Sequence, residues 1–219
     1  MLICVMRVLM SFAACCSQKA KQCWNFICNK AANFITAKQT TDMQRRLFFA
    51  LPAQELRSEL KHCQHELLTE GHKKPVKADN FHLTLHFLGM QDDSILPALY
   101  KAAADIECAP FEIRLDQYGL FHHARCLWLG PSHPPAALQV LFSRLSDKLK
   151  VLGLDVSSNY QPHITLFRNA HTPAQALAPE LELAVSEFIL YESCSTAEGV
   201  IYMPLRRWAL GKHSVHEKP

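Results

Sequence analysis

Two short motifs of the form His-x-Thr are the parts of this sequence best suited to catalysis. His82 and Thr84 make up the first, and His163 and Thr165 make up the second, 81 positions later in the chain. Aliphatic residues occupy the alternate positions in both motifs. Because the side chains of a strand alternate between two faces, we expect the imidazole and the hydroxyl of each motif on one face and the aliphatic residues on the other.

Two such pairs facing each other across a cleft would supply what phosphodiester hydrolysis needs without a metal ion. Histidine transfers protons near neutral pH because its ordinary pKa is about 6.5. Threonine hydroxyls donate hydrogen bonds to phosphoryl oxygens, whose charge grows toward the transition state. One His-x-Thr alone is more typical of a solvent-facing strand than of a catalytic site. The second, matched copy favours catalysis and suggests two similar lobes that share one centre.

The elements around the motifs predict an α+β fold. Apolar residues at helical spacing and helix start and stop signals predict helices over residues 54–68, 94–106 and 136–152. Besides the strands that hold the motifs, short apolar runs predict strands over residues 46–51, 111–120, 126–129, 181–191 and 199–210. A turn is expected over residues 89–93, after the first motif strand.

The segments that flank the motifs carry a resemblance to a known family. They include RLFFA at 46–50, KADNFHLTLHFLG at 77–89, PHITL at 162–166 and WAL at 208–210. Together they resemble the RNA 2′,3′-cyclic phosphodiesterases, also called 2′-5′ RNA ligases, of the 2H phosphoesterase superfamily, over residues 45–211. The resemblance implies two pseudo-symmetric lobes, each an antiparallel sheet flanked by helices, with the active cleft between the lobes.

The same resemblance implies a reaction and a role for each motif residue. The reaction is hydrolysis of RNA 2′,3′-cyclic phosphate termini to 2′-phosphate, without metal or other cofactor. His82 would be the proton donor to the departing 3′ oxygen, and His163 the proton acceptor that activates water. Thr84 and Thr165 would bind the phosphoryl oxygens. Two alternatives stay open: reversible 2′-5′ ligation of tRNA halves, and a module that only binds RNA ends or cyclic nucleotides.

Further side chains are candidates for the same cleft. Arg168 is expected to contact the phosphate, but strand alternation places it opposite His163, so it reaches the anion only if the strand ends or bulges near Phe167. His86 shares the face of His82 and is interpreted as a solvated strand residue, with a place in the cleft as the alternative. The aromatic residues considered for stacking on a nucleobase are Phe121, Tyr160 and Trp128, of which Trp128 is expected in the core.

The composition of the chain limits which other functional classes it can belong to. The formal net charge of +3 is too small to indicate a broad nucleic-acid surface, although it is compatible with a small positive mouth for an RNA end. The cysteines form no C-x-x-C pair and no zinc-ligand spacing. We therefore expect buried, reduced thiols in a reducing compartment, the cytoplasm. We also expect a monomer that needs neither metal nor membrane. The thiols concerned are Cys63, Cys108, Cys126 and Cys194.

The chain divides into three parts by sequence. Residues 43–213 are expected to form the phosphoesterase domain, and residues 214–219 a short tail. Residues 1–42 are interpreted as an extension outside the fold, with a targeting or anchoring segment and a partner-binding helix as alternatives. The apolar run at 2–16 is too short and too interrupted to predict a membrane-spanning helix.

Overall fold

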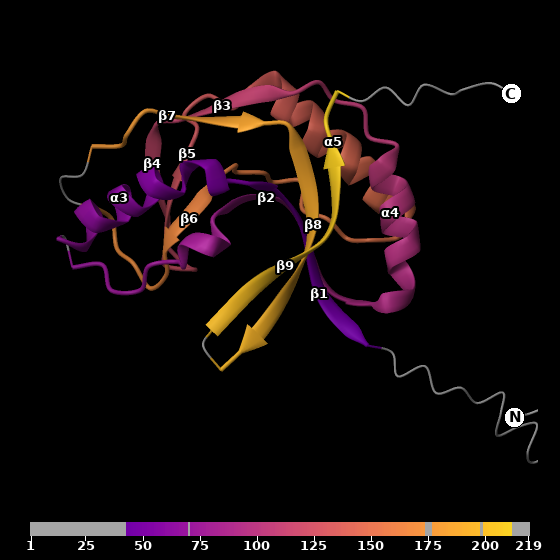
Figure 1. The fold of residues 1–219 in the computed structure, drawn as a ribbon, viewed down its shortest axis with the longest axis horizontal. Coiled ribbons are helices and arrows are strands. Elements are labelled where there is room, and N and C mark those ends of the chain that lie inside the picture. The colour runs from indigo at the N-terminus through magenta and orange to yellow at the C-terminus, as the bar shows by residue number, and fades with distance from the viewer. Residues whose placement is uncertain (1–42, 70, 174–176, 198, 212–219) are drawn as a thin grey trace, which may run out of the picture. The chain divides into compact units, whose positions relative to one another are not determined.

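A seven-stranded antiparallel sheet forms the centre of the part of the chain that the structure describes (Figure 1). The structure is a computed structural model, and it describes residues 43–69, 71–173, 177–197 and 199–211. The strands are β1 (Gln44–Pro52), β2 (His82–Asp92), β3 (Phe111–Leu115), β4 (Gln117–Phe121), β5 (Cys126–Gly130), β6 (Ile164–Phe167), β7 (Leu181–Val185), β8 (Glu187–Thr196) and β9 (Gly199–Ala209). The α-helices are α3 (Arg57–Leu68), α4 (Leu96–Ala104) and α5 (Ala136–Val151), and the 3-10 turns are η1 (Gln54–Leu56), η2 (Ala78–Asn80) and η3 (Asp93–Ile95).

The strand order reveals two related halves. In the large sheet the order is β4-β5-β6-β2-β1-β8-β9, while β3 and β7 pair separately. Reading outward from the β6–β2 junction, β6 corresponds to β2, β5 to β1 and β4 to β8, with β9 as an additional edge strand. Each half also places a helix between its two inner strands, α3 between β1 and β2 and α5 between β5 and β6. The expected two-lobed α+β arrangement of antiparallel strands is confirmed, with the inner strands of the lobes joined to each other.

Two predicted strands are each divided in the structure. The run predicted over 111–120 becomes β3 and β4, which separate at Asp116, and the run predicted over 181–191 becomes β7 and β8, which separate at Ser186. The first strand of each pair belongs to the two-stranded sheet and the second to the large sheet. Hydrogen bonds hold both breaks, because the Asp116 N–H donates to the Gly130 carbonyl and the Leu210 N–H donates to the Ser186 carbonyl. These long-range partners are not visible in a local pattern.

The predicted turn over residues 89–93 was also wrong. β2 continues to Asp92, and Gln44 at the start of β1 is its partner there. Gly89 has a φ of 71° within this strand, a backbone conformation that suits glycine. The glycine therefore marks an irregular strand, and its sequence signal resembles that of a turn.

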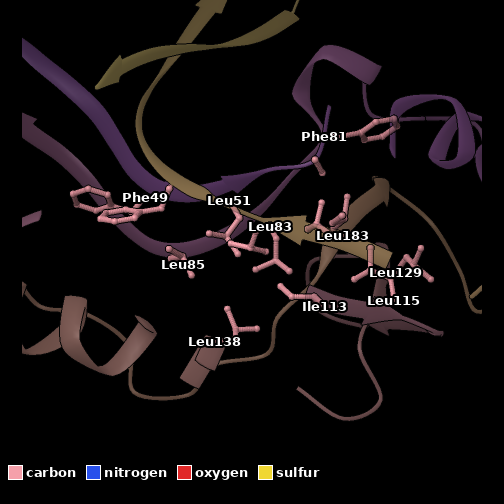
Figure 2. Packing of buried hydrophobic residues seen from close by; sticks show 14 of the residues in the cluster. Phe49, Leu51, Phe81, Leu83, Leu85, Ile113, Leu115, Leu129, Leu138 and Leu183 are labelled. Atoms are coloured by element: carbon pink, nitrogen blue, oxygen red, sulfur yellow. The ribbon is translucent and has the colours of Figure 1, made fainter. Parts of the chain in front are cut away.

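The main core lies on the face of the sheet that the helices cover. Leucines of α5 pack there against the aliphatic residues of the two motifs, and β3 and β7 complete the layer. Figure 2 shows Leu83 and Leu85 of β2 in one cluster with Ile113 of β3 and Leu138 of α5. Each leucine buried in this way stabilises the fold by about 1.5–3 kcal/mol relative to an exposed one. The motif strands are thus anchored from behind, and their opposite face is left for the cleft.

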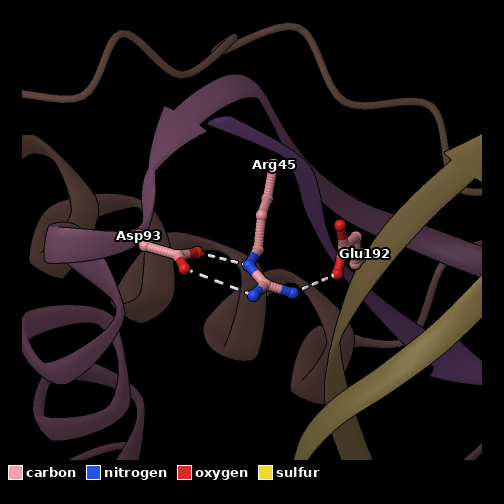
Figure 3. A network of polar contacts seen from close by, with 3 residues as sticks. All are labelled: Arg45, Asp93 and Glu192. Atoms are coloured by element: carbon pink, nitrogen blue, oxygen red, sulfur yellow. Dashed lines mark hydrogen bonds and ion pairs between the residues drawn. The ribbon is translucent and has the colours of Figure 1, made fainter. Parts of the chain in front are cut away.

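The hairpin of β8 and β9 extends past the rest of the sheet, and polar contacts fix its base (Figure 1). Arg45 of β1 binds Asp93, the first residue of η3, through Nε and Nη2, and its Nη1 donates to Glu192 of β8 at 2.6 Å (Figure 3). Farther along, the Asn80 side chain donates to the Val200 carbonyl of β9 at 2.8 Å. The hairpin is therefore tied to the two segments that flank β2, directly to η2 and through Arg45 to η3.

The cysteines follow the sequence expectation in part. All four that the structure describes are free thiols, and Cys63 and Cys126 are buried as expected. Cys108 and Cys194 are partly exposed, because the first lies in the connection after α4 and the second in the projecting hairpin. The roles predicted for residues 1–42 and 214–219 fall outside the described residues, so they stay predictions. No helix in the described ranges is long and apolar enough to cross a membrane.

Candidate active site

A single backbone pairing between β2 and β6 brings the two His-x-Thr motifs together. Leu83, the middle residue of the first motif, pairs with Ile164, the middle residue of the second, and both are fully buried. Because the strands are antiparallel, the histidine of each motif lies opposite the threonine of the other. These four side chains are half-buried and border one pocket of about 610 Å³. They are called the motif quartet below: His82, Thr84, His163 and Thr165.

Both imidazoles are held in the same way. Nδ1 of His82 lies 2.7 Å from the Asn80 carbonyl oxygen, and Nδ1 of His163 lies 2.7 Å from the Gln161 carbonyl oxygen. A carbonyl oxygen can only accept, so Nδ1 carries the hydrogen in each ring. Nε2 is then the atom that remains for proton transfer in both histidines.

A hydroxyl completes the arrangement at the first histidine. Nε2 of His82 lies 3.0 Å from Oγ1 of Thr84. With the hydrogen on Nδ1, the neutral His82 ring accepts this bond from the threonine hydroxyl at Nε2. The Nε2 atom of His82 and the hydroxyl of Thr84 are therefore adjacent at the edge of the pocket.

The surroundings of both rings disfavour their protonated form. Burial is the main reason that the pKa of His82 falls from 6.5 to about 4, and the nearby His163 and Arg168 lower it further. Burial, followed by the charge of Arg168, also lowers the pKa of His163. With these lowered pKa values both rings favour the neutral form at pH 7. An anion between them would favour the charged form of each ring and raise both pKa values.

Aromatic rings supply part of this burial at both histidines. The Tyr202 ring meets His82 edge-on, with 4.9 Å between the ring centroids and an interplanar angle of 85°. The Phe121 ring meets His163 at 4.8 Å and 84°. Such packing excludes water from the imidazole faces and limits the orientations of the rings.

Each motif strand carries a β-bulge directly after its quartet residues. In the pairing of β2 with β1 the register skips Leu85, and in the pairing of β6 with β5 it skips Leu166. A bulge of one residue reverses which face the following side chains point to. Phe87 and Arg168 consequently turn toward the pocket and border it. The condition set for Arg168, that the strand ends or bulges near Phe167, is met on both counts.

The arginine is also held by backbone and side-chain contacts. The Arg168 N–H donates to the Lys74 carbonyl at 2.9 Å, and Nη1 lies 3.8 Å from the Cys126 sulfur. Arg168 and Lys74 both border the pocket. This side of the quartet is therefore positively charged.

The interpretation of His86 was wrong, for the same structural reason. The bulge at Leu85 turns His86 into the core, where it is only 3% exposed. Its Nε2 lies 3.0 Å from the Phe142 carbonyl oxygen, and its ring stacks on the Phe142 ring at 4.2 Å. Neither a solvated position nor a place in the cleft was correct.

The three aromatic candidates have different positions. Trp128 is 7% exposed and belongs to the core as expected, with its ring lying over Gly119. Tyr160 stacks on Phe142 with ring centroids 4.0 Å apart, and its hydroxyl is buried. Phe121 borders the pocket, but its ring already packs edge-on against the ring of His163. Among the described residues, no cluster of three or more His, Cys, Asp or Glu side chains is arranged to hold a metal ion.

Several pocket residues were missed by sequence reasoning. Phe87 and Arg46 border the pocket, with the Arg46 guanidinium 4.9 Å above the centre of the Phe87 ring. Asn80 supports the site from its edge, because its carbonyl orients His82. The sequence did contain a signal for Phe87. It lies five positions after His82, just as Arg168 lies five positions after His163.

Comparison with known proteins places this geometry in a family. The profile of the 2′-5′ RNA ligase superfamily matches residues 49–193. The chain belongs to the 2′-5′ RNA ligase superfamily. The resemblance inferred from the two motifs is thereby confirmed, and the matched range contains both of them.

Individual relatives agree with this placement. The RNA 2′,3′-cyclic phosphodiesterase of Escherichia coli (strain K12) is 37% identical over 171 residues, which are 76% of this chain and 97% of that protein. The Methanocaldococcus jannaschii protein of the same name is 28% identical over 177 residues, covering 74% of this chain and 99% of that protein. The crystal structure of E. coli LigT complexed with 3′-AMP superposes with a TM-score of 0.72 at 35% identity, covering 78% of this chain and all of that one.

Proposed function

We propose that this chain hydrolyses RNA 2′,3′-cyclic phosphate termini to 2′-phosphates, with His82 as general acid and His163 as general base and without a metal ion. Cyclic phosphodiesterase activity is supported by relatives of that name that the chain matches over nearly their whole length. The observation that carries the mechanism is the pairing of Leu83 with Ile164, which gathers the motif quartet around one pocket.

The reaction proceeds by one displacement at phosphorus. Nε2 of His163 takes a proton from water as the water oxygen attacks, and the bond from phosphorus to the 3′ oxygen breaks. Nε2 of His82 gives its proton to that 3′ oxygen. The product keeps the phosphate on the 2′ oxygen and carries a free 3′ hydroxyl, and solvent restores the two imidazoles to their starting states.

The charges in the pocket support this use of two histidines. The anionic phosphate raises the low pKa of His82, so that the ring can be protonated when substrate is bound. Thr84 and Thr165 donate hydrogen bonds to the phosphoryl oxygens. Arg168 adds a charged donor on the positively charged side of the quartet. Because the quartet is nearly symmetric, its geometry does not distinguish the general acid from the general base. The assignment of these roles to His82 and His163 rests on the family resemblance.

Product analysis tests the proposal. The EDTA-treated protein is incubated with an oligoribonucleotide that ends in a 2′,3′-cyclic phosphate, in ¹⁸O-labelled water, and the product is examined by ³¹P NMR and mass spectrometry. We expect full activity, one ¹⁸O atom in the product and a 2′-phosphate. A 3′-phosphate product would contradict the assignment of His82, and loss of activity that Mg²⁺ or Zn²⁺ restores would contradict the metal-free mechanism.

The superfamily description names a second reaction at the same cyclic phosphate, RNA ligation through a 2′-5′ bond. The same four side chains would serve it, since the 5′ hydroxyl of a second RNA takes the place of water. The same assay distinguishes the two reactions when a 5′-hydroxyl RNA is added in excess, because ligation yields a longer RNA without an added ¹⁸O atom. A module that only binds RNA ends would yield neither product.

A further inference from the structure

A buried amide on α3, that of Gln64, takes no part in the mechanism described so far. Gln64 is 7% exposed and does not border the pocket. Its Nε2 donates to the Leu166 carbonyl of β6 at 2.8 Å and to the Val76 carbonyl at 2.9 Å. A carbonyl oxygen can only accept, so the NH2 of the amide faces both partners and uses its two hydrogens there. Burying an amide costs free energy unless such bonds are made.

The two carbonyls belong to a short pair of strands beside the pocket. Residues 74–76, called the strap below, pair antiparallel with the end of β6 through an isolated bridge. Two backbone hydrogen bonds hold the strap. The Val76 N–H donates to the Leu166 carbonyl at 2.8 Å, and the Arg168 N–H donates to the carbonyl of the first strap residue at 2.9 Å. The pairing therefore fixes the backbone of Arg168 itself.

Gln64 joins the two members of this pair at the bulge of β6. Leu166 is the residue that the register of β6 with β5 skips, and its carbonyl accepts from both the strap and the Gln64 amide. The bulge decides that Arg168, two residues later, turns toward the pocket. The Arg168 side chain is exposed there, so its direction depends on how firmly the backbone behind it is held.

The other half of the molecule holds its own bulge in an equivalent way. The bulge at Leu85 of β2 is followed by His86, whose Nε2 lies 3.0 Å from the Phe142 carbonyl of α5. Thus the helix of the second half holds the bulge of the first, and α3 of the first half holds the bulge of the second (Figure 1). The two halves use different buried polar side chains at the same point. This recurrence indicates that fixing the bulge is the purpose of each contact.

We propose that Gln64 is a positioning residue for Arg168. By bonding the bulge at Leu166 to the strap, it holds the guanidinium of Arg168 toward the phosphate without contacting the substrate. The proposal rests on the proposed function, since it assumes that Arg168 binds the reacting phosphate. It implies that the loss of Gln64 slows the reaction only while Arg168 is present.

A double-mutant cycle tests this dependence. Gln64→Met keeps the length of the side chain and removes both donors, and Arg168→Gln removes the guanidinium. For hydrolysis of a cyclic-phosphate dinucleotide, we expect Gln64→Met to lower kcat/KM about tenfold in the parent and less than about twofold in the Arg168→Gln background. A purely structural role would give the same loss in both backgrounds. Equal losses, or no loss in the parent, would overturn the proposal.

Leu60→Ala is the matched control for stability. Leu60 is fully buried on the same helix, and its truncation leaves a cavity but removes neither amide bond. It should lower the melting temperature while kcat/KM, measured well below that temperature, stays close to the parent value. Should Gln64→Met not fold, Gln64→Asn takes its place with the same expected cycle, because its amide is one methylene too short to reach both carbonyls.

The binding of inorganic phosphate, followed by ³¹P NMR titration, provides a readout that needs no turnover. We expect Gln64→Met to raise the Kd for phosphate about fivefold in the parent and to leave it unchanged in the Arg168→Gln background. Leu60→Ala should bind phosphate like the parent. If the parent did not hydrolyse the dinucleotide, the proposed function would fail, and this binding cycle would still decide the role of Gln64. An unchanged Kd for Gln64→Met, equal weakening in both backgrounds or no phosphate binding by the parent would overturn that role.

Discussion

Leu83 of β2 lies directly opposite Ile164 of β6, and this one pairing sets the register of the candidate active site. Both side chains point into the core, so the residues before and after each of them point together into the pocket. A shift of one residue in either strand would turn the histidine and the threonine of that motif toward the helices. The aliphatic residues of the motifs are therefore as necessary to the site as its polar ones.

Replacing either threonine of the quartet with valine should slow the reaction while preserving the fold. Thr84→Val and Thr165→Val each remove one hydroxyl donor to the phosphoryl oxygens, and we expect kcat to fall by about 10²–10³-fold, the cost of losing an oxyanion-type donor. Thr→Ser at the same positions keeps the hydroxyl and should retain most of the activity. Steady-state kinetics on a cyclic-phosphate dinucleotide provides the measurement. Equal activity of the Val and Ser variants would exclude a role for the hydroxyls.

The pH profiles of kcat/KM and kcat should differ. In the free protein the pKa of His82 is lowered to about 4 and the pKa of His163 is lowered as well. Since kcat/KM reports the free enzyme, we expect its maximum below pH 6.5. The bound anion raises both pKa values, so the maximum of kcat should lie at higher pH. Coincident profiles would contradict this account of the electrostatics.

Arg168→Gln should move the alkaline side of the kcat/KM profile to higher pH. The positive charge of Arg168 lowers the pKa of both histidines, so its removal raises both. Arg168→Lys keeps the charge and is the control, expected to retain the original profile even where its rate is lower. A profile that Arg168→Gln leaves unchanged would show that this charge does not reach the imidazoles.

His86 should make the fold less stable in mild acid. Burial, together with the charge of Lys150, lowers the pKa of His86 from 6.5 in the folded protein, although its bond to the Phe142 carbonyl acts in the opposite direction. The unfolded chain therefore binds more protons as the pH falls through 6.5, and the free energy of unfolding decreases. One such group contributes at most about 1.4 kcal/mol per pH unit.

Urea unfolding between pH 8 and pH 5.5 measures this effect. His86→Gln keeps an amide donor near the Phe142 carbonyl and does not titrate, so its stability should depend less steeply on pH than that of the parent. The histidines of the quartet contribute in the same direction in both proteins. Parallel pH dependence of the two proteins would contradict the assignment to His86.

How far the sequence predicts this site depends on the range of the interactions involved. Alternation over residues 82–85 and 163–166 is local, and it correctly predicted which side chains face the pocket and which face the core. The bulges at Leu85 and Leu166 depend on the pairing of these strands with β1 and β5, so no local pattern shows them. For that reason the position of His86 was predicted wrongly and Phe87 was missed. The contact of Arg168 with the phosphate could be predicted only on the condition that the strand ends or bulges near Phe167.

The division of the predicted strands has a similar cause. The apolar pattern continues through Asp116 and Ser186, but the chain changes sheets at both residues. The hydrogen bonds that hold these breaks come from Gly130 and Leu210, which are 14 and 24 positions away in the chain. Fold class follows from the order of elements, whereas the points at which strands leave a sheet depend on partners distant in sequence.

Single-turnover hydrolysis by His82→Ala and His163→Ala, each after EDTA treatment, tests the central claim most directly. The substrate is an oligoribonucleotide with a 2′,3′-cyclic phosphate end, and circular dichroism confirms that both variants fold. We predict that each substitution slows hydrolysis by at least about a thousandfold, because it removes a proton-transfer group and the positioning that the group provides. Hydrolysis at the parent rate by either variant would contradict the assignment of the two imidazoles to this reaction.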